Sequence, residues 1–344
     1  MKLKSLVFIC IPLFILIFCW HNVYSLNITR QYSISGRTMG TYYNVVVLSH
    51  KKVIVSNLKK SIDVQLKMIN NQMSLYQISS EISRFNKAPI NTPVHISKDF
   101  FKVLKEAENL YRITNGAWDG TIRPLYNLWK FDTTKNTAKQ IPSPKAIKAC
   151  LKKTGFNNII IKDKILIKKI KDMSLDLGSI AKGYGVDVVA NLLKDFGFKN
   201  FSVEIGGEVY VSGKKHQKKW QIGIANPSGF NGPNPYKIIN ISGKAIATSG
   251  TYRNYYKFNN KIFSHILNPK TGSPINNNIV SISVVAGNCM VADGLATGLM
   301  VMGTKKALAL VNSLDDTECM IITRKTDQSL EPFFSDDFKK YLIR

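Results

Sequence analysis

The stretch Met290-Val-Ala-Asp-Gly-Leu-Ala-Thr-Gly-Leu-Met-Val-Met-Gly303 predicts a buried helix, because apolar and small residues fill it and a glycine ends it. Asp293 and Thr297 interrupt the pattern and put a carboxylate and a hydroxyl on one face, one turn apart. A buried carboxylate is costly unless it is paired, caps a helix or binds a cation. By itself the stretch favours a capping role for Asp293 and a backbone hydrogen bond for Thr297. The alternative is a pair of oxygen ligands for Mg²⁺.

The composition is that of a folded protein with a sizeable core. The 344 residues are 44% hydrophobic and 10% aromatic, enough for one large or two ordinary domains. The net charge of +26 is typical of proteins that bind nucleic acid or anionic membranes. Its lysines are scattered among Asn and Ile, however, without a basic helix or a zinc knuckle. We therefore expect no nucleic-acid partner. The positive charge could have the secondary benefit of attracting an anionic substrate.

Residues 1–26 predict a targeting segment, because two lysines precede an apolar run over residues 6–20. The run is short for a membrane span, so cleavage and retention as an N-terminal membrane anchor are both open. A lipid anchor at Cys19 is a further alternative, although Phe18 is bulkier than the residue that usually precedes a lipidated cysteine. In each case we expect one exported domain, residues 27–344, at a bacterial inner membrane facing the periplasm.

The cysteines outside this segment argue against a disulfide scaffold. Cys150, Cys289 and Cys319 are odd in number and widely spaced, and no CxxC occurs. We expect free thiols.

Apolar periodicity along the chain predicts an α+β fold with mixed, largely antiparallel sheets and helices packed on them. Helical spacing covers residues 55–72, 97–113 with Ser97 as N-cap, and 145–153. Strand patterns cover two strands within 32–49, a hairpin at 159–161 and 165–167, and 202–205, 208–212, 220–225, 236–241, 244–248 and 279–286. A helix at 304–313 and a strand at 318–324 end the pattern.

A glycine-bounded turn, Gly116-Ala-Trp-Asp-Gly120, allows the backbone to approach a ligand closely. An aromatic ring beside a carboxylate suits the binding of a ring and a hydroxyl group. An ordinary turn with a packed Trp is an equal alternative.

The stretch Asp176-Leu-Gly-Ser-Ile-Ala-Lys-Gly-Tyr184 predicts a strand ending near Asp176 and a helix that opens near Ser179 and continues to about Lys194. Backbone N–H groups at such a helix start are a ready site for phosphate, and Lys182 adds a positive charge. The P-loop pattern is absent. The alternative is a plain junction with a solvent-facing lysine.

His265 is the most informative of the five histidines. It is predicted at a strand end, just before the turn at residues 268–272. This placement makes it a candidate base or hydrogen-bond donor, with a merely structural or exposed histidine as the alternative.

Seven short motifs occur in an order that resembles the ApbE-type FAD:protein FMN transferases. The resemblance covers residues 33–303, and its specificity lies in the order and gaps of motifs that are individually weak. Trp118 stands where Phe is common in that family, and Gly294 where Ala or Ser is common. The motifs are Met39-Gly-Thr, Met73-Ser-Leu-Tyr76 with Ser83-Arg-Phe-Asn86, Gly116-Ala-Trp-Asp119, Asp176 to Tyr184, Glu204-Ile-Gly-Gly207, Ser264-His-Ile-Leu-Asn-Pro-Lys-Thr-Gly272 and Ala292-Asp-Gly-Leu-Ala-Thr297.

The resemblance implies a T-fold-like body with FAD in a cleft. Binding of FAD is implied for Met39, Tyr76, Ala117, Trp118, Asp119, Asp176, Lys182 and the backbone near Leu267. Binding of Mg²⁺ is implied for Ser179, Asp293, Ala296 and Thr297, with Ser179 and Ala296 contributing backbone carbonyls.

The implied activity is a Mg²⁺-dependent phosphoryl transfer that moves the FMN moiety of FAD to a Thr or Ser hydroxyl of a target protein and releases AMP. His265 is our candidate base, with the metal itself as the alternative, and Asp293 holds the metal. By family analogy the acceptor is a subunit of a membrane-bound redox complex. The runner-up hypotheses are a Mg²⁺-dependent FAD pyrophosphatase and a non-catalytic exported flavin-binding protein.

Overall fold

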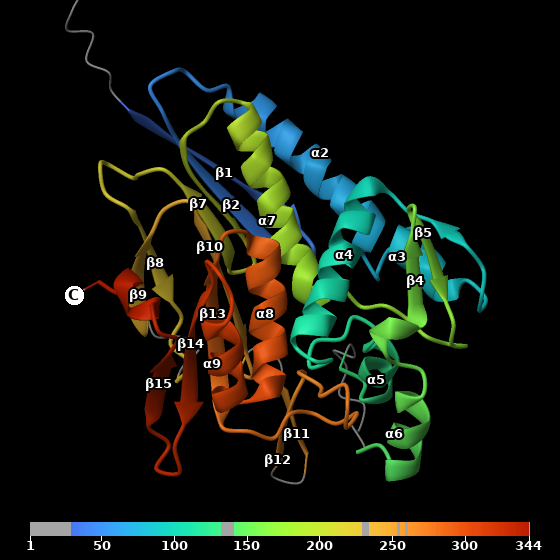
Figure 1. Ribbon diagram of the computed structural model, residues 1–344. Coiled ribbons are helices and arrows are strands. Elements are labelled where there is room, and N and C mark those ends of the chain that lie inside the picture. Colours follow the sequence, from blue (N-terminus) through green and yellow to red (C-terminus); the bar gives the residue numbers. More distant parts are fainter. Residues whose placement is uncertain (1–28, 132–140, 229–233, 253–254, 259–260, 344) are drawn as a thin grey trace, which may run out of the picture.

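An eight-stranded sheet forms the centre of the molecule (Figure 1). The computed structural model describes residues 29–131, 141–228, 234–252, 255–258 and 261–343. Every ladder described within this sheet is antiparallel. Its strands, in spatial order, are β1 (Arg30–Thr38), β2 (Thr41–Ser49), β6 (Asn200–Ile205), β7 (Glu208–Ser212), β10 (Lys244–Gly250), β13 (Ile279–Ala286), β14 (Glu318–Arg324) and β15 (Leu330–Phe334).

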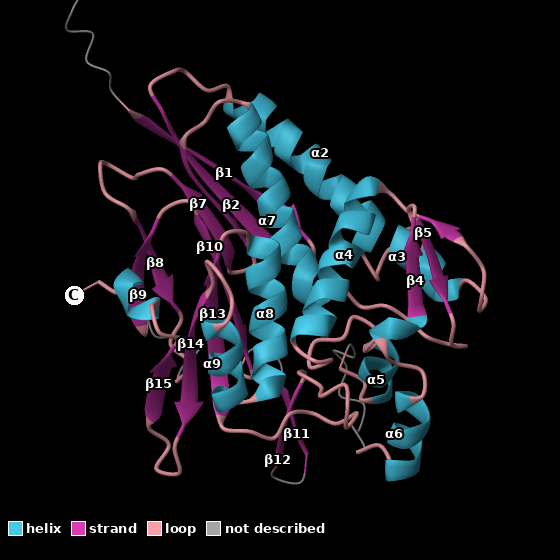
Figure 2. Ribbon diagram, viewed as in Figure 1, coloured by secondary structure: helices cyan, strands magenta, loops and turns pink. Residues whose placement is uncertain are grey.

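Helices cover one face of this sheet, and a small two-stranded sheet covers part of the other (Figure 2). Successive residues of β13 show the division: Val284 packs in the helical core, whereas Val285 packs against the second face. Burial on both faces explains why most residues of this strand are apolar. The helices are α2 (Val55–Met73), α3 (Glu81–Lys87), α4 (Lys98–Ile113), α5 (Arg123–Leu128), α6 (Pro144–Leu151), α7 (Gly178–Asp195), α8 (Cys289–Met302) and α9 (Thr304–Asn312).

Three smaller sheets and two short 3₁₀ helices complete the described structure. A three-stranded sheet lies beyond α4, on the right in Figure 1. The strands of the small sheets are β3 (Val94–His95), β4 (Ile159–Lys162) and β5 (Ile165–Lys168), then β8 (Trp220–Ile224) with β9 (Lys237–Ile241), and β11 (Tyr255–Phe258) with β12 (Lys261–Ser264). The 3₁₀ helices are η1 (Phe156–Asn158) and η2 (Phe338–Tyr341), and the second packs with β8 and β9 on the sheet's second face.

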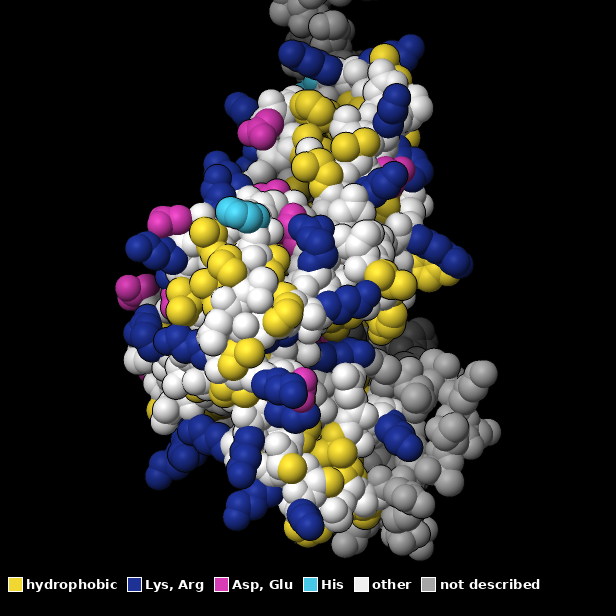
Figure 3. All heavy atoms as spheres, turned by 90° about the vertical axis from the view of Figure 1, so that its right-hand side faces the viewer, with side chains coloured by type: hydrophobic (Ala, Val, Ile, Leu, Met, Phe, Trp, Pro, Cys, Tyr) yellow, Lys and Arg dark blue, Asp and Glu magenta, His cyan; other side chains and the backbone are white. Residues whose placement is uncertain are grey.

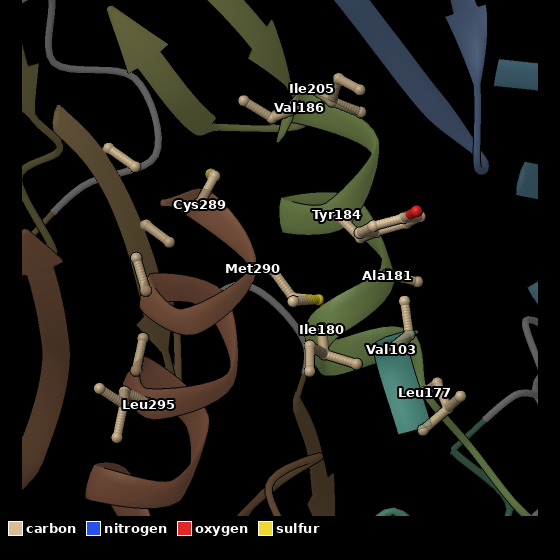
Figure 4. Packing of buried hydrophobic residues seen from close by; sticks show 14 of the residues in the cluster. Val103, Leu177, Ile180, Ala181, Tyr184, Val186, Ile205, Cys289, Met290 and Leu295 are labelled. Carbon is tan, nitrogen blue, oxygen red and sulfur yellow. The ribbon is translucent and has the colours of Figure 1, made fainter. Parts of the chain in front are cut away.

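Beside α7, which packs on β6 and β7, the helix α8 packs on β10 and β13 of the same sheet. Its residues are buried on nearly every side, as the apolar run from residue 290 predicted. In Figure 4, Met290 points from α8 toward α7, and both helices contribute to one continuous apolar core. Any polar side chain on the inner turns of α7 or α8 is therefore held in a fixed, largely dry setting.

The prediction of an α+β fold with largely antiparallel sheets is confirmed, and several local predictions are confirmed with it. The helix predicted over residues 55–72 is α2, and the Ser97 hydroxyl caps α4 by accepting a hydrogen bond from the Phe100 N–H at 3.2 Å. Cys150, Cys289 and Cys319 are free thiols. Within the described part of the chain, none of the helices combines the length and the apolarity that a membrane span requires. The targeting segment predicted at residues 1–26, with Cys19, lies outside the described residues.

Two local predictions are wrong. The strand predicted to end near Asp176 is absent, because residues 173–177 are held by a side chain rather than by a neighbouring strand. The Asn86 amide accepts from the Leu175 N–H at 2.7 Å and donates to the Leu175 carbonyl at 2.9 Å. The strand predicted over residues 244–248 was ended too early, because Ser249 and Gly250 also belong to β10. The helix α5 and the strand β15 carry no strong period and were not predicted.

Candidate active site

A cavity of about 710 Å³ lies where α7 and α8 meet the loops after β1, α2 and β12. All of the site residues predicted from the sequence line it, with the exception of Ala296, which is fully buried in α8. Those that line it are Met39, Tyr76, Ala117, Trp118, Asp119, Asp176, Ser179, Lys182, His265, Leu267, Asp293 and Thr297. The fold thus brings together residues that are spread over 259 positions of the sequence, from Met39 to Thr297 inclusive.

Three charged side chains form a cluster on the cavity wall. The Lys182 ammonium lies 3.2 Å from the Glu208 carboxylate and 3.4 Å from the Asp293 carboxylate. Both carboxylates are almost fully buried, at 2% and 3% exposure. Burial by itself lowers the pKa of Lys182, but the negative charges of Asp293 and Glu208 outweigh it and raise the pKa. The cluster carries two negative charges and one positive charge, so a net charge of −1 faces the cavity.

Asp293 does not cap its own helix, so the first hypothesis for this residue is wrong. The N-cap of α8 is Asn288, whose side chain accepts from the Val291 N–H at 2.9 Å. Asp293 instead accepts a hydrogen bond from the Gly183 N–H of α7 at 3.0 Å, beside its ion pair with Lys182. The solvent-facing alternative for Lys182 is wrong for the same reason.

The Thr297 hydroxyl lies one turn after Asp293 and also faces the cavity. It pairs with the Ser249 hydroxyl at 3.0 Å, rather than with the backbone carbonyl that the stretch by itself favoured as its partner. The wall of α8 therefore presents a carboxylate and a hydroxyl on one face, as the spacing of the two residues predicted.

The start of α7 is arranged differently from the open phosphate cradle that was predicted. The Asp176 carboxylate accepts the Gly178 N–H at 2.9 Å and pairs with the Arg123 guanidinium at 3.2 Å. A carboxylate at a helix N-terminus is favourable because it meets the positive end of the helix dipole. One N–H of the predicted cradle is thus already used by Asp176, while Arg123 adds a positive charge at the cavity wall.

Trp118 is a packed residue that also forms part of the cavity wall. Packing of this turn is confirmed, whereas binding of a ring by it stays a prediction. The Trp118 ring is 2% exposed and lies 6.2 Å from the ring of Phe156. Its indole N–H donates to the Ser179 hydroxyl at 3.0 Å, which ties the turn to the start of α7. Gly298 lets Trp118 lie close against α8, because a Cβ at this glycine would lie only 3.0 Å from the Cβ of Trp118.

Asp119 is buried beside Trp118 and is held by its neighbour Thr121. Its carboxylate accepts from the Thr121 N–H at 2.7 Å and from the Thr121 hydroxyl at 2.6 Å. Burial raises the pKa of this carboxyl, and these two hydrogen bonds lower it less than burial raises it. The carboxylate is a fixed acceptor at the cavity wall.

The segment with His265 closes another side of the cavity. His265 is half-buried and follows β12, and Leu267 is almost fully buried. The turn after them is closed by a hydrogen bond from the Gly272 N–H to the Asn268 carbonyl at 2.8 Å, and the Trp129 indole donates to the Gly272 carbonyl at 2.8 Å. The backbone that carries His265 is therefore well held.

Met39 and Tyr76 lie at two other parts of the wall. Met39 has a left-handed backbone with φ of 48° in the turn between β1 and β2, and its side chain reaches Gly185 of α7. Tyr76 is 85% exposed and lies at the rim of the cavity.

Sequence reasoning missed Glu208 and Arg123. Glu208 begins the apolar strand β7 directly after the Gly206-Gly207 turn, and a charged residue opening a buried strand was a signal that could have found it. Arg123 gave no such signal, because its partner Asp176 is 53 positions away.

Comparison with known proteins identifies the family of the chain. The family model described as the ApbE family matches residues 39–321. The chain is 40% identical to a protein from Vibrio cholerae named FAD:protein FMN transferase, over 92% of this chain and 94% of that one. It is also 40% identical to a protein of the same name from Haemophilus influenzae, over 91% and 92% of the two chains.

A solved structure, the flavin transferase ApbE from Vibrio cholerae, superposes with a TM-score of 0.82 at 38% identity. The match covers 92% of this chain and all of that one. With a family model over most of its length, relatives of this identity and a shared fold, the chain belongs to the ApbE family.

Proposed function

We propose that this chain is a FAD:protein FMN transferase, which moves the FMN moiety of FAD to a Ser or Thr hydroxyl of a target protein and releases AMP. The observation that carries the proposal is the Lys182–Glu208–Asp293 cluster on the wall of a large cavity, in a chain that matches proteins of that name over nearly their full length. A cavity of about 710 Å³ is within the usual range for small-molecule sites.

The charges around the cavity suit a diphosphate. Lys182 and Arg123 place an ammonium and a guanidinium on its wall. Positive groups that are already in position stabilise the charge that develops on phosphate oxygens during transfer. Tyr76 and the Trp118 turn lie on other parts of the wall, where the ring systems of FAD would be bound.

The residues on α8 fit a hard cation. Asp293 and Thr297 offer two oxygens one turn apart, and the net charge of −1 in the cluster favours a positive ion. Within the described ranges, no three His, Cys, Asp or Glu side chains meet as a ready-made metal site, so the backbone carbonyls of Ser179 and Ala296 and the substrate's own oxygens would complete the set. Bound Mg²⁺ supplies charge neutralisation at the diphosphate.

The transfer exchanges one phosphorus–oxygen bond for another. The acceptor hydroxyl oxygen forms a bond to the phosphorus of the FMN half, the bond from that phosphorus to the AMP half breaks, and AMP leaves with the electron pair. The hydroxyl proton passes to the base, for which His265 on the cavity wall is the candidate. Lys182 remains protonated throughout, because its two carboxylate partners raise its pKa.

Incubation with FAD, Mg²⁺ and a candidate acceptor protein tests the proposal. The acceptor is expected to gain covalent flavin fluorescence on a denaturing gel, with one AMP released per flavin attached. An acceptor that is a membrane-bound redox-complex subunit is expected to be labelled at a Ser or Thr, and replacing that residue by Ala should abolish the label. AMP and FMN released without labelled protein would favour the pyrophosphatase, and binding without either product would favour a flavin-binding protein.

We propose in addition that the protein works outside the cytoplasm, attached to the inner membrane. The pattern of residues 1–26 supports this, with two lysines before an apolar run. Fractionation of cells that express the full chain is expected to place it in the membrane fraction and to leave it open to protease added to spheroplasts. Recovery from the cytosol would contradict the proposal, and a Cys19→Ser chain that stays in the membrane would exclude lipidation as the anchor.

A further inference from the structure

The helices α7 and α8 touch almost backbone to backbone at Gly183. A Cβ on this glycine would lie 2.3 Å from the Cys289 carbonyl oxygen and 2.8 Å from the Cβ of Asp293. Figure 4 shows the same crossing, with Cys289 and Met290 at the first turn of α8 beside α7. At so close a contact, a small shift of one helix changes every distance between the cavity residues of the two.

Asp187, one turn beyond Gly183, binds the start of α8. Its carboxylate accepts the Cys289 N–H at 2.8 Å on one oxygen and the Met290 N–H at 2.9 Å on the other. The first N–H groups of a helix have no partner within the helix, and a carboxylate there also meets the positive end of the dipole. A residue of α7 therefore caps α8.

A second hydrogen bond joins the two helices at the other end of these turns, and here α7 is the donor. The Gly183 N–H of α7 donates to the Asp293 carboxylate of α8 at 3.0 Å. One turn of α7, from Gly183 to Asp187, is thus joined at both ends to one turn of α8, from Cys289 to Asp293. Two anchors one turn apart hold α8 against both sliding and rotation.

Asp187 does not line the cavity, so it takes no direct part in binding or transfer. Its contribution to the stability of the fold does not by itself explain a carboxyl group at this position. Burial raises the pKa of its carboxyl to about 6, although the N–H groups of Cys289 and Met290 and the charges of Lys102 and Lys194 lower it. A buried carboxylate that is ionised at neutral pH lowers the stability of the folded protein. Such a cost is expected of a side chain whose role is to position another element.

We propose that Asp187 is a positioning residue for the transfer site: its carboxylate holds the start of α8 against α7 and so places Asp293 and Thr297 opposite Lys182 across the cavity wall. The proposal rests on the proposed function for its effect on the rate, and on the two hydrogen bonds for its effect on α8.

Asp187→Asn tests the proposal in the full chain. An amide keeps the size of the side chain but offers a single acceptor oxygen, and its NH₂ group would face an N–H group. We expect kcat for FMN transfer to fall about 10- to 100-fold, the scale of a small misplacement of reacting groups, with the KM for FAD changed less than threefold. Asp195→Asn makes the same change at an exposed position of α7 and should behave as the wild type. A kcat for Asp187→Asn within twofold of the wild type would overturn the proposal.

Hydrogen exchange resolved to single amides gives a readout that does not need turnover. In the wild type, the Cys289 and Met290 amides should be protected as well as the interior of α8, although first-turn amides ordinarily exchange fast. Asp187→Asn should exchange about 10- to 100-fold faster there, the range for losing a hydrogen bond to a charged group.

The two failures are distinguishable. A wild-type chain without transfer activity would contradict the proposed function and leave the exchange experiment to judge the contact. Fast exchange of Cys289 and Met290 in the wild type would overturn the positioning role, whether or not Asp187→Asn folds. Asp187→Glu keeps the charge and both acceptor oxygens, and is expected to retain more of the rate than Asp187→Asn.

Discussion

One ammonium group shared by two buried carboxylates organises the candidate site at the level of single residues. Lys182 is the cation that makes burial of Glu208 and Asp293 tolerable in this structure. Because Lys182 has two partners, removal of either carboxylate still leaves it paired with the other. Either carboxylate can therefore be removed without leaving Lys182 unpaired, whereas removal of Lys182 would leave two buried carboxylates without their shared cation.

Asp293→Ala is expected to abolish Mg²⁺-dependent transfer without unfolding the protein. The Lys182–Glu208 pair remains and is electrically balanced, so the protein should stay folded, with its melting temperature lowered by loss of the hydrogen bond from Gly183. The oxygen proposed as a metal ligand on α8 is lost. Flavin fluorescence on gels and thermal unfolding by circular dichroism measure the two effects. Asp315→Ala, at an exposed carboxylate, is the control. Full activity of Asp293→Ala would return this residue to a structural role.

His265→Ala is expected to lower the transfer rate by about 10²–10⁴-fold, the usual contribution of a general base, while FAD binding stays within a few fold of the wild type. The physical reason is that, in the proposed step, the imidazole takes a proton during transfer but is not required to hold the diphosphate. Equilibrium binding of FAD and the rate under saturating FAD are the measurements. His95→Ala removes an exposed histidine and serves for comparison. A near-normal rate would remove His265 from the role of base.

At the level of elements, the site depends on how closely α7 and α8 approach each other. Their contact at Gly183 is made by backbone atoms, and it is joined to the sheet because α8 also packs on β10 and β13. Lys182 and Ser179 come from α7, whereas Asp293 and Thr297 come from α8. The positions of these four side chains relative to one another therefore depend on the packing of α7 against α8.

Gly183→Ala is expected to lower the free energy of unfolding by about 1–3 kcal/mol and to reduce transfer strongly, because the new methyl group would push α8 away from α7. The obstacle is a backbone carbonyl, that of Cys289, at 2.3 Å. Gly294→Ala makes the same change in α8 against the end of the Leu110 side chain, which can turn aside, and its effect should be smaller. Denaturant unfolding and transfer rates compare the two. Equal effects would contradict the close helix contact.

The stability of the Asp187 contact should depend on pH in a defined direction. The pKa of Asp187 is about 6 in the folded protein against an ordinary value of 3.8, so the folded state binds this proton more tightly. The resulting stabilisation is fully present below about pH 4 and is lost as the pH rises through about 6. The free energy of unfolding of the wild type minus that of Asp187→Asn should therefore fall between these values and stay constant above about pH 7. A difference that rises over this range would contradict the assignment.

The charge of the whole molecule is large but dispersed. On the face in Figure 3, Lys and Arg side chains are spread among apolar and uncharged ones rather than gathered in one band. Some of the lysines are paired on the surface, as Lys59 is with Asp63 at 2.7 Å. This distribution fits a general excess of lysine better than a groove that follows a nucleic-acid backbone.

At about 0.15 M salt, we expect the Kd for duplex DNA or RNA to lie in the range of nonspecific binding, about 10⁻⁴–10⁻⁶ M. Such contacts come from net charge alone and should show no preference for sequence. Fluorescence anisotropy over a salt series measures this, with FAD binding under the same conditions as the positive control. A sequence-selective complex in the nanomolar range would give the charge of +26 a function that we do not assign to it.

The sequence by itself determined the local elements and the residue types of the site. Apolar periods are local properties, and they located α2, α4 and α8 to within a residue or two. The spacing of Asp293 and Thr297 was sufficient to put their oxygens on one face, because the geometry of one helical turn is the same in every fold. The ordered motifs likewise pointed to the family without any knowledge of the tertiary contacts.

Only the tertiary structure decided which groups are partners. Lys182 and Asp293 are 111 positions apart, and Asp187 and Cys289 are 102 apart. A local pattern reports which side of a helix is buried, but it does not report what that side is buried against. For the same reason the strand predicted before Asp176 is absent: the hydrogen bonds of Leu175 go to Asn86, 89 positions away, and not to a neighbouring strand. Pairings of this kind depend on how the elements pack, and packing is settled only when the whole chain folds.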